Sequence, residues 1–379
     1  MKKIIAKLAF SALAILLAAH LKAQQTSAKN IFVQMHPDNW QYDPGTVRFE
    51  KVDGQLAMKI TDARHMATVK DASLTDGIIE FDIQLPSEGF STVYFRRQST
   101  NEAECFYFRT GKGRNGQAGD ALQYAPIIKG INLWDLYPQY QSDASIQPGK
   151  WNHVKAVISG KQLRVFVNDT TRPALIVPYL EGNVRGGSVA FDGAATIANL
   201  TIRRGATDGL FSLAGADITD NDPRYLRNWQ VKQKMTSMQP GIGLDNSDMP
   251  DSNTLWEPIR AERRGLINLS RKFGGDQKRK IVWLKTHIQA DANLTRRLLL
   301  GISDEVWVFI NGQLLYVDKN YFNTPTMKTP GGRISLENAS FDLPLKKGQN
   351  EILIGVANAF YGWGIIARLD DSKGLLLER

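Results

Sequence analysis

Two segments of alternating apolar and polar residues, one in each half of the chain, constrain the fold more than any other feature. Residues 151–168 alternate over two strand lengths around Gly160, and residues 305–316 do so around the pair Asn311-Gly312. Alternation with a period of two, broken by Gly or Asn, is typical of antiparallel hairpins. Asn-Gly is favoured where a two-residue turn needs positive φ. Both halves are therefore predicted to form antiparallel sheets.

Short strand-like segments fill the N-terminal half, residues 24–204, and almost no helical periodicity is present. Gly, Pro, Asn and Asp separate these segments, as in a β-sandwich. Strands are expected at residues 55–60, 77–85, 91–96, 105–109, 151–158, 162–167, 187–191 and 197–202.

A segment rich in Gly and Asp, residues 205–227, is expected to link this half to a second domain at residues 228–379. The second domain again shows strand patterns, and residues 238–253 are expected to form a long loop. The fold class predicted for the chain is all-β, with two tandem β-sandwiches. Strands of the second domain are expected at residues 280–288, 297–300, 306–310, 340–343, 351–356 and 364–368.

The first 23 residues have the features of a secretory signal peptide. Lysines begin the segment, residues 8–19 are apolar, and Ala23 is the small residue that signal peptidase prefers. The apolar run is short for a transmembrane helix, and no other stretch is apolar enough to be one. We expect cleavage to give a secreted or periplasmic bacterial protein beginning at Gln24.

Charge and cysteine content exclude two other classes of protein. The net charge is +9, four lysines of the signal segment contribute to it, and most other basic residues are scattered. A nucleic-acid-binding protein would show a stronger basic footprint, so nucleic acid is not expected as a partner. The single cysteine, Cys105, excludes an intramolecular disulfide. It lies in a strand-like run and is expected to be a packed thiol.

A series of short motifs runs through the N-terminal half in a recognisable order: residues 53–56, 77–82, 93–96, 149–154, 165–168 and 186–190. On these motifs this half resembles the concanavalin A-like lectin/glucanase superfamily, nearest to its laminin-G-like and 3-keto-disaccharide-hydrolase-like branches. This resemblance implies two curved antiparallel sheets, with ligands on the concave face or its rim loops.

The C-terminal half carries its own motifs at residues 304–312, 345–350, 356–358 and 362–364. On these motifs it resembles the galactose-binding-like jelly roll and is similar to the module that precedes the barrel in family-2 glycosidases. They serve turns and strands, so they indicate the fold and say little about a ligand.

Two motifs with catalytic or cofactor associations do not hold up. Glu80 and Asp82 resemble the start of the catalytic strand of family-16 glycoside hydrolases, but Leu85 stands where the proton-donating acid is needed. Residues 111–116 match the spacing of a dinucleotide fingerprint, but no convincing helix follows them. We predict a solvated strand face and an ordinary loop.

Metal ligands are not evident. The histidines outside the signal segment are not spaced as ligand pairs, so no metal site is predicted. Calcium stays open as a cofactor, because both resembled superfamilies often bind it through loop carboxylates. The acids that could serve are also expected in ordinary solvated loops; they are Asp217, Asp220 and Asp222, or Asp245, Asp248 and Asp251.

Two neighbouring strands predict a polar and aromatic face. Alternation places Tyr94 with Arg96, and Tyr107 with Arg109, opposite the apolar residues Val93, Phe95, Phe106 and Phe108. Tyr offers an apolar ring with a polar tip, and Arg offers a fork of donors. Such a face suits a glycan.

Tyr124 and Trp134 complete the candidate site, in the long segment before Trp151. Exposed aromatic rings there could stack on sugars, or the segment could fold over and plug the sandwich. The sequence leaves both alternatives open.

The function that these features favour is carbohydrate binding by an exported protein without catalysis of its own. The alternative is a glycoside-cleaving enzyme, 3-keto-disaccharide-hydrolase-like, with its site on the concave face. An adhesin-like structural module is a third alternative. Asp120 and Asp135 are the nearby acids an enzyme could use. The glycan, the oligomeric state and the domain that binds stay open.

Overall fold

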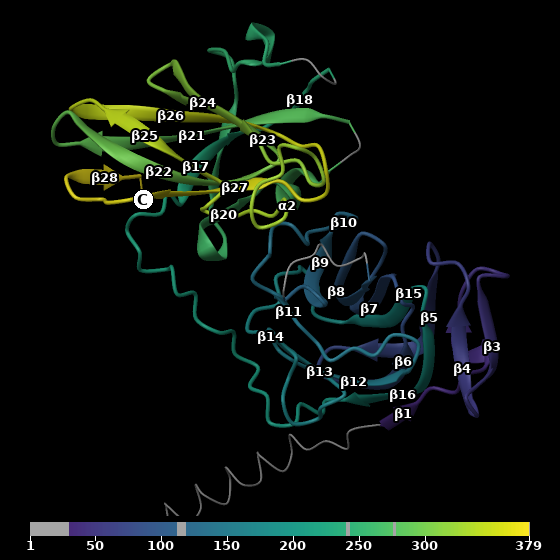
Figure 1. Cartoon of the computed structure of the whole chain (residues 1–379). Helices are drawn as coiled ribbons and strands as arrows, with labels where there is room; N and C mark the ends of the chain where they lie inside the picture. Colours follow the sequence, from purple (N-terminus) through teal and green to yellow (C-terminus); the bar gives the residue numbers. More distant parts are fainter. Residues whose placement is uncertain (1–29, 112–118, 240–242, 276–277, 379) are drawn as a thin grey trace, which may run out of the picture.

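The computed structural model describes residues 30–111, 119–239, 243–275 and 278–378. The predicted signal peptide and most of the motif at residues 111–116 lie outside these ranges. Within them the chain folds into two tandem antiparallel β-sandwiches (Figure 1), so the predicted fold class is confirmed. No helix among the described residues combines the length and the hydropathy of a membrane span.

The N-terminal sandwich consists of two eight-stranded sheets. The first sheet has the order β14-β13-β12-β6-β16-β4-β3, with β1 paired to β16. Its strands are β1 (Asn30–Phe32), β3 (Val47–Val52), β4 (Gln55–Ile60), β6 (Gly77–Gln84), β12 (Trp151–Ser159), β13 (Gln162–Val167), β14 (Leu175–Val177) and β16 (Thr196–Arg204).

The second sheet has the order β10-β9-β8-β7-β15-β5-β2, with β11 paired to β9. Its strands are β2 (Trp40–Gln41), β5 (Met66–Leu74), β7 (Gly89–Arg97), β8 (Glu102–Thr110), β9 (Leu122–Ile128), β10 (Ile131–Asn132), β11 (Gln141–Ser142) and β15 (Gly187–Gly193). The 3₁₀ turn η1 (Pro37–Asn39) leads into β2.

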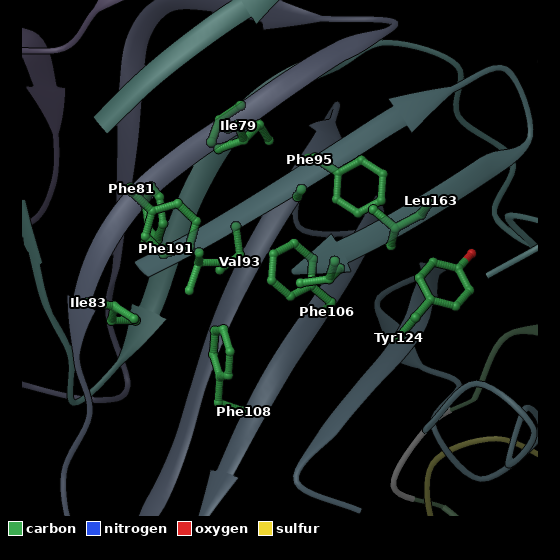
Figure 2. Packing of buried hydrophobic residues seen from close by; sticks show 14 of the residues in the cluster. Ile79, Phe81, Ile83, Val93, Phe95, Phe106, Phe108, Tyr124, Leu163 and Phe191 are labelled. Carbon is green, nitrogen blue, oxygen red and sulfur yellow. The ribbon is translucent and has the colours of Figure 1, made fainter. Parts of the chain in front are cut away.

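Apolar side chains from the facing sides of the two sheets form the core of this sandwich. Phe81 on β6 meets Phe191 on β15 edge-to-face, with ring centroids 5.2 Å apart (Figure 2). The four residues predicted to be inward on β7 and β8 are all buried here, which confirms the alternation; they are Val93, Phe95, Phe106 and Phe108.

The C-terminal sandwich packs an eight-stranded sheet on a four-stranded one. The larger sheet has the order β19-β17-β21-β26-β23-β24, with β18 and β28 paired to β21; the smaller has the order β20-β27-β22-β25. The predicted turn Asn311-Gly312 joins β23 to β24, and both residues have positive φ. The strands are β17 (Asn228–Lys232), β18 (Thr236–Ser237), β19 (Trp256–Arg260), β20 (Leu266–Asn268), β21 (Lys280–Ala290), β22 (Leu294–Ser303), β23 (Glu305–Ile310), β24 (Gln313–Lys319), β25 (Ala339–Leu345), β26 (Gly348–Ala357), β27 (Gly364–Leu369) and β28 (Leu375–Leu377).

Three short helical segments lie between the strands of the C-terminal sandwich. They are the 3₁₀ turns η3 (Asn246–Asp248) and η4 (Arg263–Gly265), and the five-residue α-helix α2 (Leu269–Phe273). Helix α2 and strand β20 lie on the side of this sandwich that faces β9 and β10 (Figure 1).

The segment between the two sandwiches runs from the end of β16 at Arg204 to the start of β17 at Asn228. It is held along its length: the Lys161 N–H donates to Ser212 O at 3.1 Å, and the Gly215 N–H donates to Pro178 O at 2.8 Å. Leu266 and Ile334, from the C-terminal half, also join the apolar core of the N-terminal half. The division into two domains linked by this segment stays a prediction.

Candidate functional site: an aromatic pocket between the two halves

The outer side of the second sheet carries a compact layer of side chains. On β8 and β9, Cys105 pairs with Ala125, and Tyr107 pairs with Gln123. The layer is buried because Trp134 and the C-terminal half cover it. The Cys105 thiol donates to Ala125 O at 3.1 Å, and burial raises its pKa well above the ordinary value, so it is a packed thiol as predicted.

A pocket of about 280 Å³ opens where this layer meets the C-terminal half. We call it the aromatic pocket. It is lined by Phe90, Thr92, Tyr107, Arg109, Asn132 and Trp134 from the N-terminal half, and by Phe322, Phe360 and Tyr361 from the C-terminal half.

Arg109 is the fixed charged group of the aromatic pocket. Its Nη1 donates to Asp120 O at 2.8 Å, and its Nη2 donates to Tyr107 Oη at 3.1 Å and to Gln123 Oε1. The guanidinium also lies 4.9 Å from the Tyr107 ring centroid and 6.0 Å from that of Phe90. A planar cation held in this way presents its remaining surface in a fixed orientation.

Trp134 is both a wall of the aromatic pocket and a joint between the halves. Its backbone oxygen accepts a hydrogen bond from Gln123 Nε2 at 2.7 Å. Its ring meets Phe322 edge-to-face at 5.0 Å and Tyr361 at 6.1 Å, and the Arg333 guanidinium lies 4.9 Å from its centroid. The ring is therefore buried, as the plugging alternative expects; it also borders a cavity, so stacking on a sugar stays a prediction.

Two buried carboxyl groups hold the loop that carries Phe360 and Tyr361. Asp304 Oδ2 accepts from the backbone N–H groups of Ala359 at 2.6 Å and Phe360 at 2.9 Å. Asp135 accepts from the Gly362 N–H at 3.1 Å. Burial raises the pKa of Asp304 to about 7 and that of Asp135 well above its ordinary range. Asp135, one of the two acids considered for catalysis, thus fastens the C-terminal half to the second sheet.

The structure places Arg96 away from the aromatic pocket and corrects its expected orientation. The pairing of β7 with β15 is irregular between Ser188 and Ala190, and Arg96 has a φ of +49°. This bulge turns the side chain inward, where it donates to Thr75 O at 2.6 Å and to Asp76 Oδ1 at 2.9 Å. Its guanidinium is buried and serves to hold loops together.

Tyr124 also lies elsewhere than expected, because its segment is strand β9 and not a loop. Its ring points into the core of the sandwich (Figure 2). The hydroxyl donates to Glu104 Oε2 at 2.6 Å and accepts from the Glu181 N–H at 2.6 Å. Tyr94 does face outward, and its hydroxyl donates to Asp192 Oδ2 at 2.6 Å, outside the lining of the aromatic pocket. Three of the six predicted residues line the pocket: Tyr107, Arg109 and Trp134.

The sequence-based site missed the three aromatic residues that the C-terminal half contributes. Phe360 and Tyr361 stand together between a strand and the Gly362-Trp363 pair, and each is more than two-fifths exposed. An aromatic pair in a loop was a readable signal. Nothing local to the sequence indicated that this loop would face Trp134.

Glu80 and Asp82, which the sequence rejects as a catalytic pair, and several of the acids it leaves open as calcium ligands have partners within the protein. Glu80 and Asp82 lie on the outer side of the first sheet, and both contact His153. Asp217 and Asp222 accept hydrogen bonds within turns, and Asp245 with Asp248 caps η3. Among the described residues no group of three or more His, Cys, Asp or Glu side chains is arranged to hold a metal ion.

Comparisons with known proteins support the resemblance of the N-terminal half. Residues 28–191 match the family model of the 3-keto-alpha-glucoside-1,2-lyase-like domain. This match confirms the predicted resemblance to the 3-keto-disaccharide-hydrolase-like branch. A search of curated proteins gives no significant match.

Solved structures with a similar fold cover less than half of the chain. The carbohydrate-binding module CBM66 from Bacillus subtilis is 16% identical, with coverage of 44% of this chain and 95% of the module and a TM-score of 0.31. A β-glucanase from Bacillus licheniformis is 7% identical, with coverage of 47% and 99% and a TM-score of 0.33. A galectin from Caenorhabditis elegans is 12% identical, with coverage of 44% and 96% and a TM-score of 0.27.

Proposed function

We propose that this protein is an exported carbohydrate-binding protein and that the aromatic pocket receives a sugar. The observation that carries the proposal is the composition of the pocket: six aromatic rings surround one fixed guanidinium and the side-chain amide of Asn132. Flat apolar rings suit the C–H faces of a sugar, and the polar groups suit its hydroxyls. The match of residues 28–191 to a family named for a glucoside-cleaving activity agrees with a saccharide ligand.

The size of the aromatic pocket limits what it can hold. Its 280 Å³ is just below the ~300–1,000 Å³ usual for ligand pockets. A single sugar ring or the end of a glycan fits this volume better than the middle of a long chain. We therefore propose recognition of a terminal residue.

Binding without chemistry is favoured by the groups that line the aromatic pocket. Glycoside cleavage needs an acid and a base positioned at the bond that breaks. The described lining residues include no carboxylate and no histidine, and burial raises the pKa of the Tyr107 hydroxyl above its ordinary value. Tyr107 therefore stays protonated at neutral pH and acts as a hydrogen-bonding group.

The experiment is a glycan array followed by calorimetry on the best ligand, with Phe360→Ala and Tyr361→Ala. These rings are 43% and 47% exposed, so their removal should leave the fold intact. Each loss should weaken binding about two- to thirteenfold, because one ring contact is worth about 0.5–1.5 kcal/mol. Phe211→Ala is the matched control, since Phe211 lies in the linking segment and is 78% exposed. Unchanged affinity in both variants would place the site elsewhere.

A second candidate function, cleavage of a 3-keto-α-glucoside, is favoured by the family match alone. A lyase of that kind removes the proton next to the keto group, so it requires a base near the sugar. Asp120 is the candidate acidic residue, because its backbone oxygen accepts a hydrogen bond from the Arg109 guanidinium of the aromatic pocket. Product formation by the wild type that Asp120→Asn abolishes, with sugar affinity retained, would establish the enzyme and replace the binding proposal.

Export is the remaining part of the proposal. It rests on the charged start, the apolar run and the Ala23 boundary of the sequence. Intact-mass analysis of protein from the native host should show a chain beginning at Gln24. A major species beginning at Met1 would contradict it.

A further inference from the structure

We infer that a second site, distinct from the aromatic pocket, binds the acidic groups of a saccharide. The site is a cleft of about 810 Å³ between the two halves. We call it the basic cleft. Six cationic side chains line it: Lys161, Arg185, Arg227, Arg260, Arg263 and Arg271.

The cations of the basic cleft come from separate elements that only the tertiary fold brings together. Lys161 lies in the turn after β12, and Arg185 lies between β14 and β15. Arg260 ends β19, and Arg263 begins η4. Arg271 belongs to α2. The linking segment closes one side through Arg227 and Asp220.

Three of these cations are occupied by the protein itself. Arg271 forms an ion pair with Glu262, with Nε 2.5 Å from Oε1. Lys161 Nζ donates to Leu180 O at 3.0 Å, and Arg227 donates to the Thr219 hydroxyl at 3.0 Å. These contacts fix the walls of the basic cleft.

The other three arginines carry unused donors. Among the residues that the structure describes, Arg185, Arg260 and Arg263 make no side-chain hydrogen bond and no ion pair within 4 Å. Arg263 is held by stacking, with its guanidinium 4.4 Å from the ring centroid of Tyr179. Guanidinium forks match carboxylate, sulfate and phosphate geometry, so their donors suit an anion.

The acids that line the basic cleft do not cancel this charge. Glu262 is already paired with Arg271. Glu181 is buried, its Oε1 accepts from the Tyr140 hydroxyl at 2.7 Å, and Asp220 is exposed at the rim. With six cations and three acids, the lining keeps an excess of positive charge, and such an excess around a concave space raises the local electrostatic potential, which draws anions into it.

The ligand class follows from the shape and the charge together. A volume of 810 Å³ is near the upper end of the ~300–1,000 Å³ range, so the basic cleft has room for a short oligomer. The Tyr179 ring is already engaged by two cations, Arg263 and Lys161, whose Nζ lies 4.9 Å from the ring centroid. Recognition in the cleft therefore depends on charge and not on stacking. The saccharide part of the inference rests on the proposed function, whereas the anion site rests on the three arginines.

The test is calorimetry on the full-length mature protein at low salt. The probes are a short oligogalacturonate, a short sulfated maltooligosaccharide and the neutral maltooligosaccharide of the same length. The two acidic probes distinguish carboxylate from sulfate as the recognised group. We expect at least one acidic probe to bind and the neutral probe to bind much more weakly. Added salt should weaken the binding of the acidic probe.

The variants are Arg185→Gln and the double change Arg260→Gln with Arg263→Gln. Each lost charge-assisted contact should weaken the acidic probe by about tenfold or more. Arg48→Gln removes one exposed charge on β3, outside the basic cleft, and should change the affinity less than about twofold, as surface charges usually do.

Three outcomes would overturn the inference: equal binding of acidic and neutral probes, unchanged affinity in the variants with normal melting temperatures, or tighter binding of a DNA oligonucleotide of similar charge. Failure of the proposed function looks different. In that case Phe360→Ala and Tyr361→Ala leave sugar binding unchanged while the basic-cleft variants still lose the acidic probe.

Discussion

The buried carboxyl of Glu104 should make the stability of this protein fall between about pH 4.5 and pH 7. Glu104 is fully buried, and burial raises its pKa from 4.5 to about 7. The folded state therefore holds the proton more tightly than the unfolded chain does. The stabilisation is complete below the unfolded pKa and is lost as pH rises through the folded pKa.

The perturbation is Glu104→Gln, which keeps the shape and leaves an oxygen to accept from the Tyr124 hydroxyl. A pKa displaced from 4.5 to about 7 corresponds to about 3 kcal/mol of unfolding free energy at pH 8. At pH 5 most of this penalty is absent. Between pH 5 and pH 8 the free energy of unfolding of the wild type should thus fall by about 2–3 kcal/mol more than that of the variant.

Urea denaturation of both proteins at the two pH values measures this difference. Burial also raises the pKa of Glu181 and of Asp304 to about 7, and both groups are common to the two proteins, so their effects cancel. Glu50→Gln, an exposed carboxylate on β3, is the matched control and should follow the wild type. Unfolding free energies that change equally with pH in the wild type and in Glu104→Gln would refute the reasoning.

Three further predictions concern the interface and the C-terminal core. Trp307 is 5% exposed in β23, so Trp307→Ala should lower the free energy of unfolding by about 3–5 kcal/mol and the melting temperature by several degrees. An unchanged melting temperature would place this ring on the surface. Asp135→Ala leaves the buried Gly362 N–H without its acceptor, so the free energy of unfolding should fall by about 1–3 kcal/mol and sugar binding at the neighbouring aromatic pocket should weaken. Thermal melting and calorimetry measure the two effects, and wild-type values for both would contradict the role given to Asp135. Limited proteolysis should cut the chain within residues 205–227, yet the two fragments should elute together in size-exclusion chromatography, because Leu266 and Ile334 of the C-terminal half join the N-terminal core. Separate elution would mean that the interface between the halves is weak.

The sequence by itself determined the class of fold and the inner faces of its strands. Side-chain alternation is a local property of an extended chain, so Val93 and Phe95 could be assigned to the core without any knowledge of their neighbours. The Asn311-Gly312 turn was equally readable, because its positive φ depends on those two residues alone. The same alternation correctly placed Tyr107 and Arg109 on the opposite side of their strand.

Only the tertiary structure decided which residues share a site. Arg96 left the predicted face because an irregularity in pairing with β15, almost a hundred residues away, reverses its direction. Tyr361 reached Trp134, and Phe360 the same pocket, because Asp304 holds their loop within the C-terminal half and Asp135 fastens it to the N-terminal half. The arginines of the basic cleft likewise come from elements that lie far apart in the sequence and meet only where the two halves dock. Pairing register and docking are set by contacts distant in sequence, and a local pattern carries no information about them.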